Sequence, residues 1–270
     1  MNSELMEWLN LFGRWIHLVA GIMWLGQTWL FQWMERAMDP AGDGDPNTMG
    51  ELWMVHGGGF YFLRKLKWPK QMPNTLHWFK WEAAVTWLSG MFLLAVVYWM
   101  GAPLLPYGSE YSRAFGIGVS IGSLLLGWAG YLAIFRSPLG KNEAVGAAVA
   151  FFATLAVAWG LGQVLGTRAM YLHIGAMYGT IMVANVWMVI IPAQKKIMAI
   201  MEKGGTPDFT LSSKGKNASR HNTFMAIPVL FTMISSHFPA ATFGRDHNVL
   251  ILGLMILLGW AGAKVIRDVL

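Results

Sequence analysis

Seven long apolar stretches divide this chain of 270 residues, and they constrain its fold more than any other feature. Each is close to the roughly 20 residues that an α-helix needs to cross a bilayer core. Inside a bilayer the backbone can satisfy its hydrogen bonds only in helices or closed barrels, and stretches of this length indicate helices. The sequence predicts an all-α polytopic membrane protein with seven transmembrane helices, at about 9–33, 79–100, 114–135, 144–166, 168–191, 222–240 and 248–266.

Lys and Arg are concentrated in alternate connections between these stretches. The two long connections hold Arg36, Arg64, Lys65, Lys67, Lys70, Lys195, Lys196, Lys203, Lys214, Lys216 and Arg220. The positive-inside rule then places the N-terminus in the periplasm and the C-terminus in the cytoplasm of a multi-pass bacterial inner-membrane protein. We expect one membrane domain over 1–270, with 34–78 as a cytoplasmic or interfacial loop. The 192–221 connection is predicted to be a cytoplasmic loop that is mobile over 202–219.

The composition excludes several kinds of site and partner. The chain has no cysteine, which removes disulfides, iron–sulfur clusters, thiolate zinc sites and covalently attached c-type haem. The net charge is +6, but the cations flank apolar stretches, where they set topology and contact anionic headgroups. Membrane lipid is therefore the expected partner, and nucleic acid is not.

Histidines occur in the same order in two parts of the chain. His17 and His173 lie near the outer ends of the first and fifth predicted helices, and His77 and His221 begin the second and sixth. This order, together with the long basic connection that follows each outer histidine, predicts a four-plus-three internal repeat.

Two histidines at matched depth on different helices meet the usual requirement for haem b in a helical bundle. We predict one or two haem b groups, the outer one ligated by His17 and His173 as the metal ligands. Gly13 and Gly21 flank His17 on one helix face and leave room for the macrocycle. His237 is an alternative ligand to His173. The competing interpretation is that each histidine hydrogen-bonds a neighbouring helix.

A second group of polar residues maps to the cytoplasmic side. Its members, the candidate catalytic residues, are His56, His77, Lys80, Glu82, Arg220 and His221. The cations and the glycines after His56 favour a small planar anionic substrate. Glu82 or a histidine is the expected proton acceptor. The alternatives are a second haem site and simple contact with lipid headgroups.

Several segments together carry a family resemblance. They are FGRWIHLVAGIMWLG, GELWMVHGGGFY, LHWFKWEAAVTWLSG, YLHIGAMYGTIMVANVWMVIIPAQKKIM and RHNTFMAIPVLFTMISSHFP. In this order they resemble the membrane domain of the bacterial cytochrome-c-linked urate oxidase family, also called urate hydroxylase. The resemblance covers nearly the whole chain. It implies oxidation of urate to 5-hydroxyisourate by an eight-helix membrane unit that passes electrons to a periplasmic cytochrome c.

The chain departs from that family pattern in two ways. It shows neither an eighth span nor a CxxCH motif, so we expect a separate cytochrome c or other redox subunit as electron acceptor. The family pattern also has a second His and an Asn after the first histidine, where Gln27 and Gln32 stand here. These differences put urate itself in doubt as the substrate.

The sequence thus predicts a membrane redox protein of the urate oxidase type. It would oxidise urate or a related small molecule and pass electrons through haem to a cytochrome c or a respiratory acceptor. The alternative is a non-catalytic haem-binding membrane anchor or electron-transfer subunit of a larger redox complex. A transporter is less favoured, because the predicted midplane offers few charges.

Overall fold

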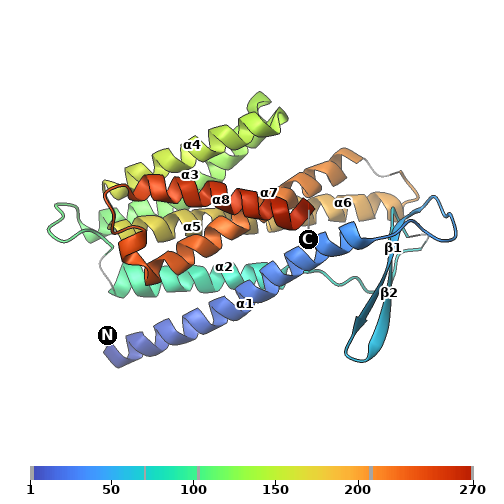
Figure 1. Cartoon of the computed structure of the whole chain (residues 1–270), viewed down its shortest axis with the longest axis horizontal. Coiled ribbons are helices and arrows are strands. Elements are labelled where there is room, and N and C mark those ends of the chain that lie inside the picture. The colour runs from blue at the N-terminus through green and yellow to red at the C-terminus, as the bar shows by residue number, and fades with distance from the viewer. Residues whose placement is uncertain (1–2, 70, 102–103, 207–208, 269–270) are drawn as a thin grey trace.

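The computed structural model describes residues 3–69, 71–101, 104–206 and 209–268, so Lys70 lies outside the described part of the chain. These residues form a helical bundle with one β-hairpin at its side (Figure 1). The helices are α1 (Ser3–Ala37), α2 (Trp81–Leu94), α3 (Arg113–Arg136), α4 (Glu143–Gly162), α5 (Thr167–Ala184), α6 (Ile191–Glu202), α7 (Phe209–Ile234) and α8 (Asn248–Asp268).

Two π-helical segments and three short 3-10 turns complete the helical structure. The π-helical segment Ala95–Gly101 extends α2, and Asn185–Ile190 joins α5 to α6 in one continuous helix. The 3-10 turns are Pro138–Lys141, Ser235–His237 and Pro239–Ala241.

Within the described residues, five helices are long and apolar enough to cross a membrane. They are Trp81–Gly101, Arg113–Arg136, Glu143–Gly162, Thr167–Glu202 and Asn248–Asp268. The fold is therefore compatible with a membrane protein. Helices α1 and α7 are not among the five, and the first half of α7 is rich in Ser, Lys and Asn. Seven spans, the internal repeat and the orientation remain predictions.

Helix α5 forms the centre of the bundle. It packs against α2, α3, α4 and α7, and α8 covers α7 and α4 from outside. Helix α1 lies at the edge and contacts mainly α2, which separates it from α5 (Figure 1). The core accordingly gathers around α5, where Tyr171 and Ile174 are fully buried.

The 34–78 connection contains a β-hairpin, so the prediction of an all-α fold is wrong in this region. Strands β1 (Thr48–His56) and β2 (Gly59–Leu66) pair antiparallel around a two-residue turn. The turn is Gly57-Gly58, and both glycines have positive φ, 62° and 80°. A two-residue hairpin turn of this kind needs positive φ at both positions, which glycine adopts without strain. Aromatic residues such as Trp53 and Phe62, which face each other, favour the strands.

The 192–221 connection is mostly helical, so the prediction of a mobile loop over 202–219 is wrong. Helix α6 prolongs α5, and α7 already begins at Phe209. Helices α6 and α7 pack as a hairpin that projects beyond the other helices (Figure 1). Gly204, at φ 73°, follows α6 in the left-handed conformation that ends many helices. Low hydropathy suggested a loop here, but the segment is stabilised by packing of its two helices.

Both hairpins emerge from the same end of the bundle, where α1 ends and α2 begins (Figure 1). Most Lys and Arg residues of the two long connections therefore gather at this end, which we call the basic end. The predicted clustering of cations on one side of the bundle is consistent with this arrangement. Which side of a membrane the basic end faces remains a prediction.

Candidate functional site: a polar layer at the basic end

His17 of α1 lies against α2. Its Nδ1 is 2.9 Å from the Thr86 carbonyl oxygen and 3.1 Å from Ser89 Oγ. The small-residue face beside it is also occupied by α2, because a Cβ on Gly13 would come within 2.8 Å of Leu93. Gly21 faces Thr86 in the same interface. The glycines that flank His17 thus allow close helix packing and leave no room for a macrocycle.

His173 of α5 is fully buried, and both of its ring nitrogens are hydrogen-bonded. Nε2 is 2.6 Å from Ser120 Oγ, and Nδ1 is 2.7 Å from the Ala169 carbonyl oxygen. A carbonyl oxygen only accepts, so Nδ1 carries the proton and Nε2 accepts from the Ser120 hydroxyl. The ring also contacts Tyr98 edge-on, with centroids 5.9 Å apart. No ring nitrogen is left for a metal unless one of these bonds breaks.

The structure does not bring His17 and His173 together. His17 is level with Thr86 to Gly90 on α2, whereas His173 is level with Tyr98, about 12 Å further along the same helix. Two axial imidazoles must lie on opposite sides of one iron atom. The two residues therefore do not fit a shared haem in this arrangement. His237 is exposed in a 3-10 turn beyond α7. Haem b remains a prediction that none of these contacts supports.

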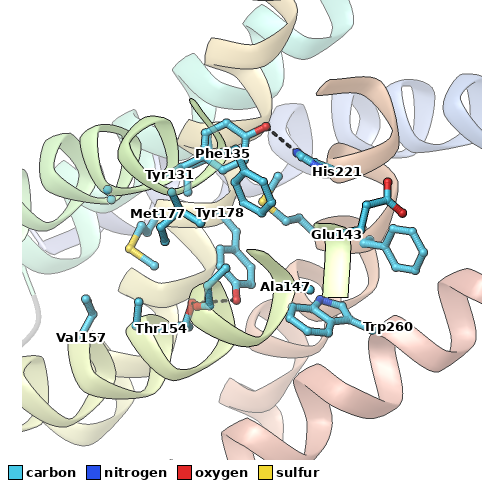
Figure 2. A pocket seen from close by; sticks show the side chains of 18 of the residues that line it. Tyr131, Phe135, Glu143, Ala147, Thr154, Val157, Met177, Tyr178, His221 and Trp260 are labelled. Atoms are coloured by element: carbon cyan, nitrogen blue, oxygen red, sulfur yellow. Dashed lines mark hydrogen bonds between the residues drawn. The ribbon is translucent and has the colours of Figure 1, made fainter. Parts of the chain in front are cut away.

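At the basic end, four side chains from α3, α7 and the π-helical segment after α5 form a hydrogen-bonded chain. Asn185 Nδ2 donates to Asn222 Oδ1 at 2.9 Å and to the Tyr131 hydroxyl oxygen at 3.1 Å. The Tyr131 hydroxyl is in turn 2.8 Å from His221 Nδ1 (Figure 2). These residues, together with Gln27, Lys80, Glu82 and Trp187 described below, are called the polar layer.

The direction of each hydrogen bond among these four side chains follows from one backbone contact. Asn222 Nδ2 donates to the Met182 carbonyl oxygen at 2.9 Å, so Asn222 Oδ1 must face Asn185 and accept. Asn185 therefore presents its amide nitrogen, and the hydroxyl of Tyr131 accepts from it. The Tyr131 proton is then free for His221 Nδ1. Neutral His221 consequently carries its own proton on Nε2.

Glu82 of α2 lies at the same level of the bundle as Asn185, the first residue after α5. Trp87 Nε1 donates to Thr180 Oγ1 at 3.0 Å, and the rings of Trp81 and Trp187 contact at 5.7 Å between centroids. Because α2 and α5 run antiparallel, position 82 falls opposite the start of the π-helical segment. Glu82 Oε1 accepts from Gln27 Nε2 at 3.2 Å, which ties α1 to the layer.

Three buried polar atoms in this region have no hydrogen-bond partner. They are Glu82 Oε2, Asn185 Oδ1 and Trp187 Nε1. Buried polar atoms are nearly always paired, so atoms of this kind indicate a bound ligand or water. Asn185 also opens a π-helical segment, a distortion that is frequent at functional sites. Two acceptors and one donor thus lie at about the same level of the bundle, where α2 is opposite the junction of α5 and α6.

Lys80 supplies positive charge next to these atoms. Its ammonium lies over the rings of Trp81 and Trp187, 5.3 and 5.6 Å from their centroids. Such cation–π contacts hold a lysine in place without neutralising it. The layer therefore offers fixed positive charge beside a carboxylate, as an anionic substrate with ring N–H groups requires.

The other candidate catalytic residues lie at different distances from the polar layer. Arg220 precedes His221 on α7 but forms an ion pair with Glu143 of α4. His56 is exposed at the tip of the β-hairpin, and His77 is exposed before α2. The structure therefore brings Glu82, Lys80 and His221 to the layer, keeps Arg220 beside it, and leaves His56 and His77 outside.

Sequence reasoning missed Tyr131 and Asn222, which hold the chain of hydrogen bonds together. A signal existed, because a polar side chain inside an apolar helix is costly unless it has a partner or a function. Gln27 and Gln32, the departures from the family pattern, both lie near this end. Gln27 bonds Glu82, and Gln32 Nε2 donates to Thr223 Oγ1 at 2.5 Å.

Comparison with known proteins identifies the family. The model described as urate oxidase N-terminal matches residues 3–268, almost the whole chain. No curated protein and no solved structure gives a significant match. The match covers every element that builds the polar layer, from α1 to α8. The chain therefore belongs to the urate oxidase N-terminal family.

Proposed function

We propose that this chain is an oxidoreductase that oxidises urate, or a closely related oxidised purine, in the polar layer. The observation that carries the proposal is the trio of unpartnered buried atoms, Glu82 Oε2, Asn185 Oδ1 and Trp187 Nε1, in a member of this family. Such atoms cost free energy when left unpaired, so a ligand that pairs them gains binding energy.

An oxidised purine has the complementary groups. It is planar, presents several ring N–H donors and carbonyl acceptors, and is anionic near neutral pH. The two unpartnered oxygens accept from ring N–H groups, and the indole N–H of Trp187 donates to a carbonyl. The ammonium of Lys80, held over Trp81 and Trp187, balances the negative charge of the ring. Gln27 orients Glu82 by bonding its other oxygen.

The reaction that fits this arrangement is hydroxylation of the ring by water. A water oxygen forms a bond to the purine carbon, while two electrons and two protons leave, giving the 5-hydroxy product from urate. Glu82 is the general base that takes a proton, because its Oε2 is free for the substrate or the attacking water. The electrons pass to a separate acceptor, which we expect to be a cytochrome c or another respiratory redox partner.

The test uses the full chain in lipid nanodiscs with urate and ferricyanide, a soluble one-electron acceptor. We expect urate loss and ferricyanide reduction in a ratio of one to two. Glu82→Gln should lower the rate by about 100-fold or more, the usual contribution of a general base. Glu110→Gln, in an exposed loop, is the matched control and should behave like wild type.

Two outcomes contradict the proposal. If folded wild-type protein oxidises neither urate nor a related purine with ferricyanide or cytochrome c, the non-catalytic electron-transfer subunit is the better interpretation. If oxidation occurs but Glu82→Gln keeps the wild-type rate, the chemistry lies elsewhere than in the polar layer.

A further inference from the structure

A cleft adjoins the polar layer and shares Tyr131 and His221 with it. It lies between α3, α4, α5, α7 and α8 and has a volume of about 490 Å³, within the range of small-molecule sites. Small residues of α3 and α4 leave this space, among them Gly130, Ala147 and Ala150. Its walls are largely aliphatic and aromatic (Figure 2). An occupant must therefore be mostly apolar.

The cleft also presents two hydrogen-bond donors. His221 lines it, and since Nδ1 accepts from Tyr131, the Nε2–H remains to donate. Trp260 of α8 lines it too, and its indole Nε1 is buried with no partner. Figure 2 shows Trp260 beside Ala147 and His221 farther away, next to Tyr131. The occupant therefore carries acceptor groups on an apolar body.

The charges around the cleft argue against a phosphate headgroup. Arg220 is the cation among the lining residues, and it is paired with Glu143 at the mouth of the cleft. A phospholipid headgroup would need an uncompensated cation, whereas neutral carbonyl oxygens need only N–H donors. These features together match a planar dicarbonyl ring with an aliphatic tail.

We propose that this cleft binds an isoprenoid quinone, which is the electron acceptor for the reaction in the polar layer. The ring carbonyls accept from His221 Nε2–H and Trp260 Nε1–H, and the tail lies along the alanine face of α4. This inference rests on the proposed function for its electron source, but the binding site stands on the cleft alone.

Urate, water and the quinone balance the reaction without another reactant. Oxidation of urate with water releases two electrons and two protons, and a quinone takes up two of each to become a quinol. Tyr131 is the side chain that joins the two sites, because its hydroxyl accepts from Asn185 and donates to His221. His221 gives its Nε2 proton to one quinone oxygen and recovers one at Nδ1 from the Tyr131 hydroxyl. Of the two protons that urate oxidation releases, one restores the Tyr131 hydroxyl and the other protonates the second quinone oxygen.

The experiment measures binding and turnover separately, using full-length protein in nanodiscs and decylubiquinone as the probe. Binding is followed by quenching of tryptophan fluorescence, and turnover by quinone reduction on addition of urate. Wild type should bind one quinone and reduce it with urate. Trp260→Phe should weaken binding by about three- to tenfold, the loss of one hydrogen bond.

A matched pair of substitutions on α4 controls for general damage to the helix. Ala147→Phe fills the cleft and should abolish saturable quinone binding. Ala148→Phe adds the same ring one position away, on an exposed face outside the cleft, and should bind quinone like wild type. Far-ultraviolet circular dichroism verifies that both variants are folded.

The outcomes separate this inference from the proposed function. Urate oxidation with ferricyanide but no saturable quinone binding overturns the cleft assignment and leaves the proposed function intact. Quinone binding that Ala147→Phe abolishes, without urate oxidation by any acceptor, supports the site and removes its electron source. Equal quinone binding in Ala147→Phe and Ala148→Phe, or displacement by phosphatidylglycerol at equimolar concentration, assigns the cleft to lipid and overturns the proposal.

Discussion

Helices α1 and α5 have the same outline in the sequence and different positions in the bundle. Each carries a histidine in its first half and leads into a long basic connection. Four of the 35 residues of α1 are buried, against eleven of the 18 residues of α5. Helix α1 packs mainly on α2 and exposes Trp15, Leu18 and Ile22, whereas α5 has helices on all sides. A similar hydropathy and a similar order of residues thus occur in an edge helix and in a central helix, and they do not distinguish the two positions.

The two histidines differ in the same way. His17 uses one ring nitrogen, toward a single neighbouring helix. His173 uses both, and its partner Ser120 also accepts from Trp99 Nε1 at 3.0 Å. A central polar side chain must satisfy all of its hydrogen bonds within protein, while an edge residue has fewer constraints. The same residue type therefore stabilises the fold to different extents in the two helices.

The largest expected effect concerns these histidines. His173→Ala removes a fully buried ring and leaves the Ser120 hydroxyl without its acceptor. We expect it to lower the free energy of unfolding by about 3 kcal/mol, from the cavity and the lost hydrogen bonds. His17→Ala should cost about 1 kcal/mol. Thermal unfolding in detergent measures both, and equal losses would remove the distinction between edge and centre.

An optical spectrum sharpens the same comparison. With both His173 nitrogens bonded and His17 two turns away along α2, we expect no bis-histidine haem signal that depends on both residues. The dithionite-reduced minus air-oxidised spectrum of purified protein measures this. A low-spin haem b spectrum that disappears in both His17→Ala and His173→Ala would show that these helices rearrange around a shared haem.

A smaller effect is expected from the glycines of the two helices. A Cβ on Gly175 of α5 would lie 2.1 Å from Thr232 Oγ1, whereas one on Gly21 of α1 would meet only Thr86 Cγ2 at 3.9 Å. Gly175→Ala should therefore destabilise the protein by about 2 kcal/mol through overpacking. Gly21→Ala should change the stability by about 0.5 kcal/mol or less, or raise it, since alanine favours helix. Chemical denaturation compares the two variants, and a larger loss for Gly21→Ala would contradict this packing.

The smallest effect lies in the connection that follows α1. Asp43 accepts from the Asp45 backbone N–H at 3.1 Å and from Arg64 at 2.8 Å, and these bonds lower its pKa below the usual 3.8, the backbone bond most. A lowered pKa means that the ion pair stabilises the hairpin above pH 3.8 and is lost as the pH falls through the lower, folded-state value.

Arg64→Gln tests which of these two bonds lowers the pKa of Asp43 more. It should raise the pKa of Asp43 only part of the way to 3.8, because the backbone bond remains. Carbon NMR of the labelled carboxyl, titrated with acid, measures the change. Full recovery of the ordinary pKa in Arg64→Gln would show that the arginine, and not the backbone, dominates.

The sequence was sufficient for five of the seven expected apolar helices, the family and the shared end of the basic connections, because these depend on composition and period. It was insufficient for the β-hairpin around Gly57-Gly58 and for the helical start of α7, where pairing of two segments decides the structure. It named Glu82 and His221, but it placed His17 and His173 at matched depth, whereas the structure separates them along α2. A residue's place within its own helix can be read from sequence, whereas how far that helix is shifted along its neighbours depends on packing.

Urate binding at equilibrium tests the central claim most directly, because it does not depend on the electron acceptor. Wild-type protein in nanodiscs should bind one labelled urate in equilibrium dialysis. Asn185→Ala, which removes a buried unpartnered oxygen of the polar layer, should weaken binding by about tenfold or more. Gln163→Ala, an exposed amide after α4, should bind like wild type. Folded Asn185→Ala that binds urate with wild-type affinity would contradict placing the substrate in the polar layer.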